Sequence, residues 1–181
     1  YSERIAGFGY DDCPPHPTWL EPAEWLGSEK AVRHPLHLIS NQPNSRLHSQ
    51  MDMGPVSRAA KVKGREALLI HPDAAAARGI QDGDVVRVFN DRGACLAGAV
   101  VGDGIAPGVV RLPSGAWYDP EDPDRPGSLD KHGNPNVLTL DKGTSRLGQG
   151  PSAMTALVEI EKWNGDAPPI TAFAPPAMSE A

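Results

Sequence analysis

The chain has 181 residues, with 17 Lys and Arg against 23 Asp and Glu, so its formal charge (17 − 23) is −6. This length fits one domain, with or without extensions. The 19 glycines and 19 prolines make up about a fifth of the chain, which disfavours a helical bundle because proline interrupts helices. No apolar run approaches the roughly 20 residues that cross a bilayer, which excludes a membrane span. The acidic balance argues against broad nucleic-acid binding, which needs a basic surface.

The two cysteines, Cys13 and Cys95, lie far apart in sequence and form neither a CxxC motif nor a disulfide framework. We expect two free thiols, which leave the cellular compartment open. The chain begins at Tyr1 and not at Met, so the lack of a visible signal peptide says little about targeting.

Residues 1–33 are predicted to form an irregular lead-in. The prolines within residues 12–17 rule out a helix or a central strand there, because they fix φ and remove donors. The segment Glu21–Leu26 predicts one or two helical turns, with Pro22 at a first-turn position and Gly27 at the end. The lead-in lacks the apolar periodicity to fold alone, so we expect it to pack against another part of the protein.

Short apolar runs from residue 34 onward predict β-strands. They occupy residues 36–39, 67–70, 85–89, 94–101, 109–112 and 156–160. Pro72 followed by Asp73, a run of alanines and Gly79 predicts one compact helix. Residues 90–93 predict a hairpin turn. Together these signals indicate a mainly β fold, a small barrel with one or two short helices.

Two further segments are predicted to be irregular. A connection of about 38 residues, 113–150, far exceeds the 12–15 residues above which a loop is usually functional or disordered. It carries Trp117, Asn136 and Arg146 among its glycines, which favours a functional loop. The Pro- and Ala-rich residues 164–181 predict an extended or disordered tail.

The polar loop Ser40–Gln50 is the most informative stretch of the chain. It combines hydroxyls, amides, a guanidinium and an imidazole with one aliphatic side chain, Leu47. Such a set suits a pyrophosphate, because Arg46 can donate two parallel hydrogen bonds to phosphate oxygens while Ser and Asn donors serve the others. A solvated polar loop is the alternative, since polar loops are the norm.

Glycine-rich segments at residues 133–136 and 143–150 form a second candidate site. Glycine lets the backbone approach a ligand closely, and amides such as Asn136 and Gln149 can read the donor and acceptor edges of a purine-like ring. Turn chemistry alone explains these glycines about as well. The phosphate-binding pattern GxxxxGK[ST] is absent.

Metal binding and nucleophilic catalysis receive less support. His34, His37 and His48 lie close in sequence, but His34 and His37 would fall on opposite faces of a strand, which favours structural or surface histidines. There is no GxSxG elbow, and neither cysteine has an evidently electropositive setting. The residues by themselves therefore predict a ligand-binding barrel without a visible catalytic centre.

Several motifs, in order and in register, carry a resemblance to a known family. They are His34–Ser40, Arg46–Gln50, His71–Ala74, Arg78–Val86, Asn134–Thr139 and Gly143–Gly150. They resemble the C-terminal domain of the molybdopterin guanine dinucleotide enzymes, the dimethyl sulfoxide reductase family. Residues 9–17 and 21–25 resemble its S- and N-oxide reductase branch, with the biotin sulfoxide and trimethylamine N-oxide reductases looking closest. The resemblance covers roughly residues 1–163.

The resemblance implies a fold and a cofactor. It implies a six-stranded double-psi β-barrel over residues 34–163, with residues 1–33 as a lead-in from the preceding domain and residues 164–181 as a tail. In that family the barrel is the last domain of a much longer chain and grips one of two pterin dinucleotides that chelate molybdenum. The implied cofactor is therefore molybdenum bis(molybdopterin guanine dinucleotide).

The resemblance also implies cofactor-binding residues, carried over by motif position. They are Ser40, Asn41, Pro43, Arg46, His48, Ser49, Gln50, Trp117, Asp119, Asn136 and Gln149. Arg46 would bind phosphate, and Asn136 and Gln149 would contact the cofactor from the opposite loop. Trp117 and Asp119 would lie at the guanine or ribose end.

The implied function is cofactor binding within a larger enzyme. The branch binds molybdenum through a serine in an upstream domain, and nothing in this sequence matches that segment. The whole enzyme would transfer an oxygen atom from an S-oxide or N-oxide to reduced molybdenum, which two electrons regenerate. The implied partners are the upstream domains, the small oxide substrate and an electron donor, and the isolated chain should be inactive.

Two alternatives stay open. The chain could be a stand-alone barrel that binds a nucleotide or a partner protein. It could also belong to the formate dehydrogenase or nitrate reductase branch, which shares the barrel. The compartment, bacterial cytoplasm or periplasm, stays open as well.

Overall fold

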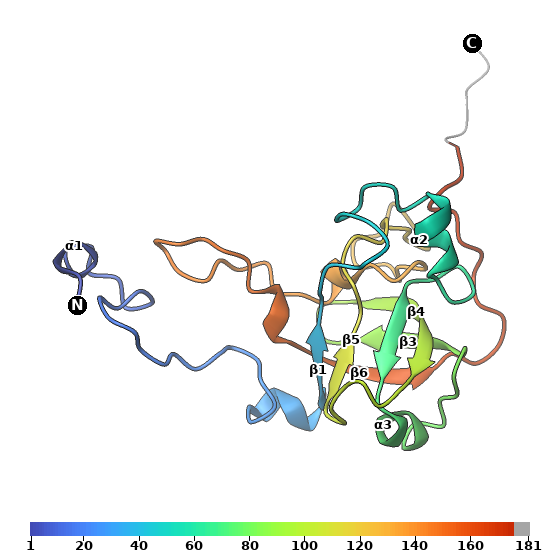
Figure 1. Ribbon diagram of the computed structural model, residues 1–181, viewed down its shortest axis with the longest axis horizontal. Coiled ribbons are helices and arrows are strands. Elements are labelled where there is room, and N and C mark those ends of the chain that lie inside the picture. The colour runs from blue at the N-terminus through green and yellow to red at the C-terminus, as the bar shows by residue number, and fades with distance from the viewer. Residues whose placement is uncertain (176–181) are drawn as a thin grey trace, which may run out of the picture.

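Six short strands close into a barrel in the computed structural model, which describes residues 1–175 (Figure 1). The strands are β1 (Leu36–Ile39), β2 (Ala67–Ile70), β3 (Val85–Phe89), β4 (Ala94–Val101), β5 (Val109–Arg111) and β6 (Ala156–Lys162). The α-helices are α1 (Glu3–Ala6), α2 (Pro55–Ala59) and α3 (Pro72–Ala76), and the 3₁₀ helices are η1 (Glu29–Val32), η2 (Pro135–Val137) and η3 (Ala153–Thr155). The predicted strands are confirmed to within two residues at their ends, and α2 is an addition.

The strand order around the barrel is β1-β5-β2-β4-β3-β6. β1 runs parallel to β5, with His37 opposite Val109, and β2 runs parallel to β4, with Ala67 opposite Gly98. The other four neighbouring pairs are antiparallel. The partners in each parallel pair are separated by other strands in the sequence, so the chain must cross the barrel between them. This interleaved, closed arrangement is the double-psi β-barrel that the family resemblance implied.

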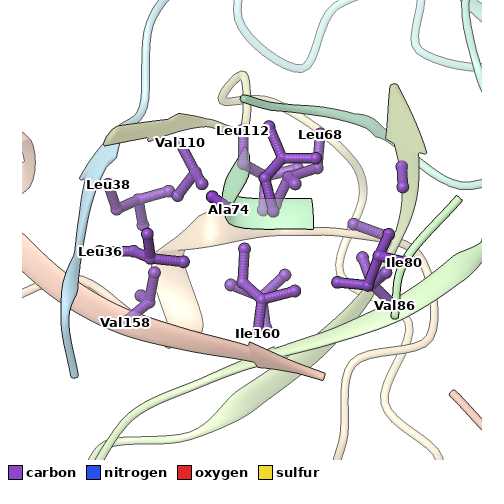
Figure 2. Packing of buried hydrophobic residues seen from close by; sticks show 14 of the residues in the cluster. Leu36, Leu38, Leu68, Ala74, Ile80, Val86, Val110, Leu112, Val158 and Ile160 are labelled. Carbon is purple, nitrogen blue, oxygen red and sulfur yellow. The ribbon is translucent and has the colours of Figure 1, made fainter. Parts of the chain in front are cut away.

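Aliphatic side chains fill the barrel because they alternate along the strands. In β1 and β3, every second residue is buried. Figure 2 shows side chains from strands all around the barrel turned inward toward one another. Its labelled members are Leu36, Leu38, Leu68, Ala74, Ile80, Val86, Val110, Leu112, Val158 and Ile160. Each fully buried Leu, Ile or Val contributes about 1.5–3 kcal/mol of transfer free energy, so this cluster supplies most of the stability of the fold.

β4 is the exception to this alternation, because six consecutive residues from Ala94 to Ala99 are buried. The long connection covers its outer face: Asp130 forms a parallel bridge with Cys95, and Leu96 N–H donates to the Asp130 carbonyl at 2.8 Å. Part of the 113–150 segment is therefore a structural layer of the barrel wall.

The predicted helix at Glu21–Leu26 is wrong, since the first helical turn near this position is η1, Glu29–Val32. The reason is Glu24, which is 2% exposed and accepts hydrogen bonds from Arg92 (2.6 and 2.9 Å) and from the backbone N–H of Leu157 (3.0 Å). Drawing this carboxylate into the barrel wall pulls the backbone away from a helical path.

The tail after β6 is extended, as predicted, in the part that the structure describes. Residues 164–175 run from the end of β6 back toward α2 (Figure 1). They are held there by hydrogen bonds to the barrel wall, such as Arg65 Nη2 to the Pro168 carbonyl at 2.7 Å. Residues 176–181, which the tail prediction also covers, lie outside the described residues.

Two smaller expectations concern thiols and membrane spans. Cys13 and Cys95 are free thiols, as predicted. Within residues 1–175, no helix has both the length and the apolar character needed to cross a bilayer.

The Glu24–Arg92 pair yields a pH-dependent stability prediction. Burial by itself raises the pKa of Glu24, but hydrogen bonds from Arg92, Lys30 and the Leu157 N–H outweigh burial and lower it from 4.5 to about 2. A carboxylate with a depressed folded-state pKa stabilises the fold above its unfolded pKa, and this contribution is lost as pH falls through the folded pKa.

We expect Glu24→Gln to lower the free energy of unfolding at pH 7 by about 3 kcal/mol, because Arg92 loses its buried anionic partner. The difference between the two proteins should shrink as pH falls from about 4.5 to about 2, where the wild-type carboxylate protonates. Urea unfolding of both proteins at stepped pH measures this difference. A constant gap across that window would contradict the prediction.

Candidate cofactor-binding site

The polar loop 40–50 leaves the barrel where two parallel strands end together. Leu112 N–H donates to the Ile39 carbonyl at 3.0 Å, and Ser114 N–H donates to the Asn41 carbonyl at 2.9 Å. The chains that follow β1 and β5 therefore continue side by side beyond the sheet. In Figure 1 these loops and α2 lie at one end of the barrel, and α3 lies at the other.

A glycine allows the two loops to touch. Gly115 has φ +93°, and a Cβ built there would overlap the carbonyl oxygen of His48. Trp117 continues the contact: its Nε1–H donates to the Ser49 carbonyl at 2.8 Å, and its backbone N–H donates to Asp52 Oδ2 at 2.9 Å. Trp117 is thus packed directly against the 48–50 segment, and its contact with the guanine or ribose end of a cofactor stays a prediction.

Arg46 lies beneath this loop, with its side chain 0% exposed. Its guanidinium donates to the Glu66 carboxylate at 3.0 Å and to the Ser114 carbonyl at 2.9 Å. It also donates to Ser57 Oγ at 3.1 Å and to the His48 carbonyl at 3.2 Å. Every nitrogen of the guanidinium therefore has a protein partner, so the geometry gives Arg46 a role in shaping the loop. Its contact with phosphate stays a prediction.

A second cation completes this buried network. Lys61 lies 2.9 Å from both Asp52 and Glu66, and its side chain is 2% exposed. Burial by itself raises the pKa of Asp52, but Lys61 and the N–H of Trp117 lower it below its usual value. The two carboxylates and the two basic side chains around the loop, Arg46 among them, are therefore all paired with one another.

A cleft of about 180 Å³ opens between the loop and the barrel end. It is lined by Asn41, Pro43, Asn44, Ser45, Ala60, Glu66, Ala67, Arg111 and Pro113. The cleft contains Asn41 and Pro43, which the resemblance singled out. The buried Oδ1 of Asn41 has no hydrogen-bond partner among residues 1–175, and such an atom calls for a donor from a ligand or a water molecule.

Arg111 is a candidate that the sequence analysis missed. It is exposed at the end of β5, and its guanidinium forms no hydrogen bond or ion pair within the described part of the chain. An unpaired cation beside a cleft with amide and hydroxyl donors suits an anion. Only the parallel pairing of Ile39 with Arg111 brings it beside the polar loop, and sequence alone does not reveal that pairing.

The remaining residues predicted at the polar loop are more exposed. Ser40 is half-buried, while His48, Ser49 and Gln50 are exposed at the tip. His48 has φ +49° and contacts the side chain of Gln42. None of these four residues is part of the cleft lining.

Asp119 lies below the surface and is 5% exposed. Its carboxylate accepts two hydrogen bonds from Thr171 and pairs with Lys131 at 3.2 Å. Burial by itself raises the pKa of Asp119, but the bonds from Thr171 and Lys131 lower it below its usual value. In this structure the Asp119 carboxylate therefore anchors the tail after β6 through Thr171.

Asn136 and Gln149 lie apart from the polar loop. Asn136 is exposed on η2, and Gln149 is exposed on the hairpin closed by the Gly143–Pro151 bridge. Within the described residues, neither forms a hydrogen bond with residues 40–50. Figure 1 shows this hairpin reaching away from the barrel, on the side of the lead-in. The single chain therefore assembles the 40–50 and 113–117 loops but not the complete predicted set.

The hairpin contacts the lead-in directly. The backbone N–H of Arg146 donates to Asp12 at 3.0 Å, and its guanidinium lies 4.7 Å from the centre of the Tyr10 ring. A second cleft, of about 310 Å³, separates residues 20–23 from the hairpin base. Gln149 therefore lies on a hairpin that contacts the lead-in, residues 1–33.

Asp130 is a second residue that the sequence analysis missed. It is 0% exposed, and its carboxylate accepts backbone N–H groups from Asp119 (2.8 Å), Gly133 (2.7 Å) and Asn134 (2.7 Å). Burial raises the pKa of Asp130 despite these bonds. An Asp followed three residues later by Gly-Asn is the signal for such a turn. Asp130 sets the path of the chain just before Asn136.

The histidines form no metal centre within residues 1–175, where no group of three His, Cys, Asp or Glu side chains is arranged to hold an ion. The ring of His34 instead lies 3.3 Å from Asp91.

With this geometry established, similarity to known proteins decides the family. Residues 36–157 match the molydopterin dinucleotide binding domain. The chain belongs to this family. The match covers β1 to β5 and the first two residues of β6, and it includes both loops that meet at the cleft.

Three curated relatives are similar along nearly all of the chain. The dimethyl sulfoxide/trimethylamine N-oxide reductase of Cereibacter sphaeroides is 52% identical over 97% of this chain. The biotin sulfoxide reductase of the same organism is 55% identical over 92% of this chain. Trimethylamine-N-oxide reductase 1 of Escherichia coli K12 is 53% identical over 94%. The matched regions are 21%, 22% and 20% of those proteins, so the chain spans about a fifth of their length. These similarities confirm the predicted resemblance to the S- and N-oxide reductases.

A solved structure supports the fold independently. Acetylene hydratase from Pelobacter acetylenicus aligns with 90% of this chain and 23% of its own, at a TM-score of 0.72 and 23% sequence identity. At this identity the likeness concerns the fold alone.

The contact at Gly115 can be tested with a matched pair of glycine variants. Gly115 (φ +93°) and Gly127 (φ +76°) both have left-handed backbones, but a Cβ at Gly127 would meet nothing within 4 Å. Gly127→Ala should cost about 1–2 kcal/mol of unfolding free energy, the usual penalty for a left-handed Ala. Gly115→Ala should cost clearly more, because His48 must also move. Equal losses in urea unfolding would show that the loop contact contributes nothing.

Proposed function

We propose that this chain is the cofactor-binding domain of a molybdenum-dependent oxidoreductase that reduces S-oxides or N-oxides. The observation that carries the proposal is 52–55% identity to three reductases of such oxides, over at least 92% of the chain. In this proposal residues 34–163 are the dinucleotide-binding barrel, residues 1–33 lead in from the preceding domain, and residues 164–181 are the tail. Upstream domains supply the metal ligand, the substrate site and the contact with an electron donor.

The cofactor in this proposal is the bis(molybdopterin guanine dinucleotide) form, of which this barrel binds one dinucleotide. The residues at the cleft suit part of such a ligand, because Arg111 offers an unpaired cation and Asn44 and Ser45 offer neutral donors. A cleft of about 180 Å³ is large enough for a phosphate or ribose portion. The rest of the ligand would extend over His48, Ser49 and Gln50. Asn136 and Gln149 would reach it from loops completed by upstream domains.

The residues of this chain contribute binding and orientation. The formal charge of −6 opposes an anionic ligand, so a local cation at the cleft is required. Arg46 and Lys61 hold the loop in shape, and Arg111 is free to meet the ligand. When bound, the molybdenum group would supply two-electron oxygen-atom transfer.

The proposal is tested on the full-length protein that contains this chain. We expect it to purify with molybdenum and a guanine-containing pterin dinucleotide, and to reduce dimethyl sulfoxide, trimethylamine N-oxide or biotin sulfoxide with a reduced dye as electron donor. A protein produced in a host that makes the cofactor, yet free of pterin and inactive on all three oxides, would exclude the function.

The role of Arg111 has a matched control in Arg125. Both arginines are exposed, and neither side chain has a hydrogen-bond or ion-pair partner in the described part of the chain. Arg111→Gln should reduce the retained pterin dinucleotide about tenfold or more, since a charge-assisted bond contributes about 1.5–3 kcal/mol. Arg125→Gln should leave retention unchanged. Fluorescence of the oxidised pterin released from each purified protein gives the amount, and equal retention in both would remove Arg111 from the site.

Arg46 should behave differently from Arg111. Arg46→Ala leaves Lys61 as the only Lys or Arg paired with Glu66 and Asp52 within residues 1–175, so it should lower the free energy of unfolding by about 3–5 kcal/mol as well as cofactor retention. Arg111→Gln should change retention alone. Urea unfolding beside pterin content separates the two roles. Unchanged stability in Arg46→Ala would show that the buried network does not shape the loop.

A further inference from the structure

The tail after β6 returns to the end of the barrel that carries the cleft. Thr171 donates its backbone N–H to one oxygen of Asp119 at 2.7 Å and its hydroxyl to the other at 2.6 Å. Lys131 Nζ donates to the hydroxyl of Thr171 at 2.9 Å. Thr171 thus attaches the tail to Asp119 and Lys131, which pair with each other in the barrel wall.

The barrel depends on these bonds in return. Asp119, Lys131 and Arg65 are 5%, 7% and 5% exposed. Besides its 2.7 Å bond to the Pro168 carbonyl in the tail, the Arg65 guanidinium forms only a 3.3 Å hydrogen bond with the Lys63 carbonyl within residues 1–175, and its Nε has no partner there. A buried charge that loses a hydrogen-bond partner destabilises the fold. Removing the tail would take such partners from Asp119, Lys131 and Arg65 and so lower the free energy of unfolding.

Phe173 extends the tail to the loops of the site. Its ring lies 5.5 Å from the Trp117 ring at an interplanar angle of 66°, and 5.0 Å from the His132 ring at 89°. These are edge-to-face arrangements. His132 is itself 0% exposed and contacts the carbonyl of Trp117 at 2.9 Å. Trp117 is therefore contacted both by Phe173 directly and by His132, which itself packs against Phe173.

Trp117 passes this constraint on to the polar loop. Its Nε1–H donates to the Ser49 carbonyl, and the preceding Gly115 packs against His48. We propose that residues 164–174 act as a strap and that Phe173 is a positioning residue, which holds Trp117 and through it the 48–50 loop. The effect of the strap on pterin retention rests on the proposed function, whereas the mechanical coupling does not.

The coupling is tested by hydrogen exchange in the full-length protein, produced in a host that makes no pterin dinucleotide. Phe173→Leu keeps an apolar side chain but removes the ring. We expect amides in residues 46–52 and 113–119 to exchange about two- to tenfold faster, the range that corresponds to the loss of aromatic pairs. Phe173→Tyr keeps the ring and should restore the wild-type rates. Peptides from β4 should not change in either variant, which separates this effect from a general loss of stability.

Ile170→Ala is the matched control within the strap, because Ile170 faces Gly64 and has no contact with Trp117 among those described. It should leave exchange in residues 46–52 and 113–119 unchanged. Thr171→Val, which removes the hydroxyl bonds, should accelerate both peptides. Unchanged exchange in Phe173→Leu and Thr171→Val, or equal acceleration in Ile170→Ala, would overturn the proposal.

A parallel preparation from a host that makes the cofactor separates this inference from the proposed function. We expect Phe173→Leu to retain less pterin dinucleotide than the wild type and Phe173→Tyr to retain as much. If the wild type itself contains no pterin dinucleotide, the proposed function fails while the exchange result still decides the strap. If the wild type contains it and Phe173→Leu retains it fully with unchanged exchange, the strap fails while the function stands.

Discussion

The buried charge network around Arg46 is the constraint on which the cofactor end of the barrel depends. Arg46 is joined to Glu66 just before β2, to Ser57 on α2 and to Ser114 after β5, so it connects three separate segments of the chain. Because buried charges must stay paired, none of these segments can shift alone without exposing an unpaired group to the interior. An otherwise irregular loop thereby acquires one shape. As a consequence, Arg46, the residue that the sequence most strongly suggests as a phosphate-binding group, already has its hydrogen bonds within the protein.

This arrangement explains how an acidic chain can offer a site for an anion. The cations nearest the loop, Arg46 and Lys61, are neutralised by Asp52 and Glu66 within the network. They contribute no net attraction to a phosphate at the surface. Arg111, which stands outside the network at the end of β5, is left to provide it. Structural cations and ligand-binding cations are thus separated, and a substitution in one group has consequences different from those in the other.

The elements of the barrel could be predicted from sequence because the patterns that define them are local. Alternating aliphatic residues, the Pro72 start of α3 and the turn at residues 90–93 each depend on a few neighbouring positions, and all were confirmed. The helix expected at Glu21–Leu26 failed because Glu24 is bound to Arg92 and Leu157, which are 68 and 133 residues away. A local pattern carries no information about such a partner.

The candidate site likewise combines features that the local sequence indicates with features that only the fold creates. The polar loop 40–50 borders the cleft and contacts Trp117, and cofactor binding by these residues stays a prediction. The burial of Arg46 and the freedom of Arg111 could not be predicted, because they depend on the parallel pairing of β1 with β5 and on an ion pair with Glu66. Composition identifies which side chains suit a ligand, whereas topology decides which of them remain available.

The two ends of the chain differ in how they meet the barrel. The tail is fixed through buried groups, Asp119 and Arg65. The first 20 residues instead contact the exposed 143–151 hairpin through Asp12 and Tyr10, and they carry apolar side chains such as Trp19, which is 77% exposed. A large exposed aromatic on an irregular segment gains no burial energy from this chain. The relatives are about five times longer, and in our proposal the lead-in and the hairpin form a surface that the rest of a longer protein covers.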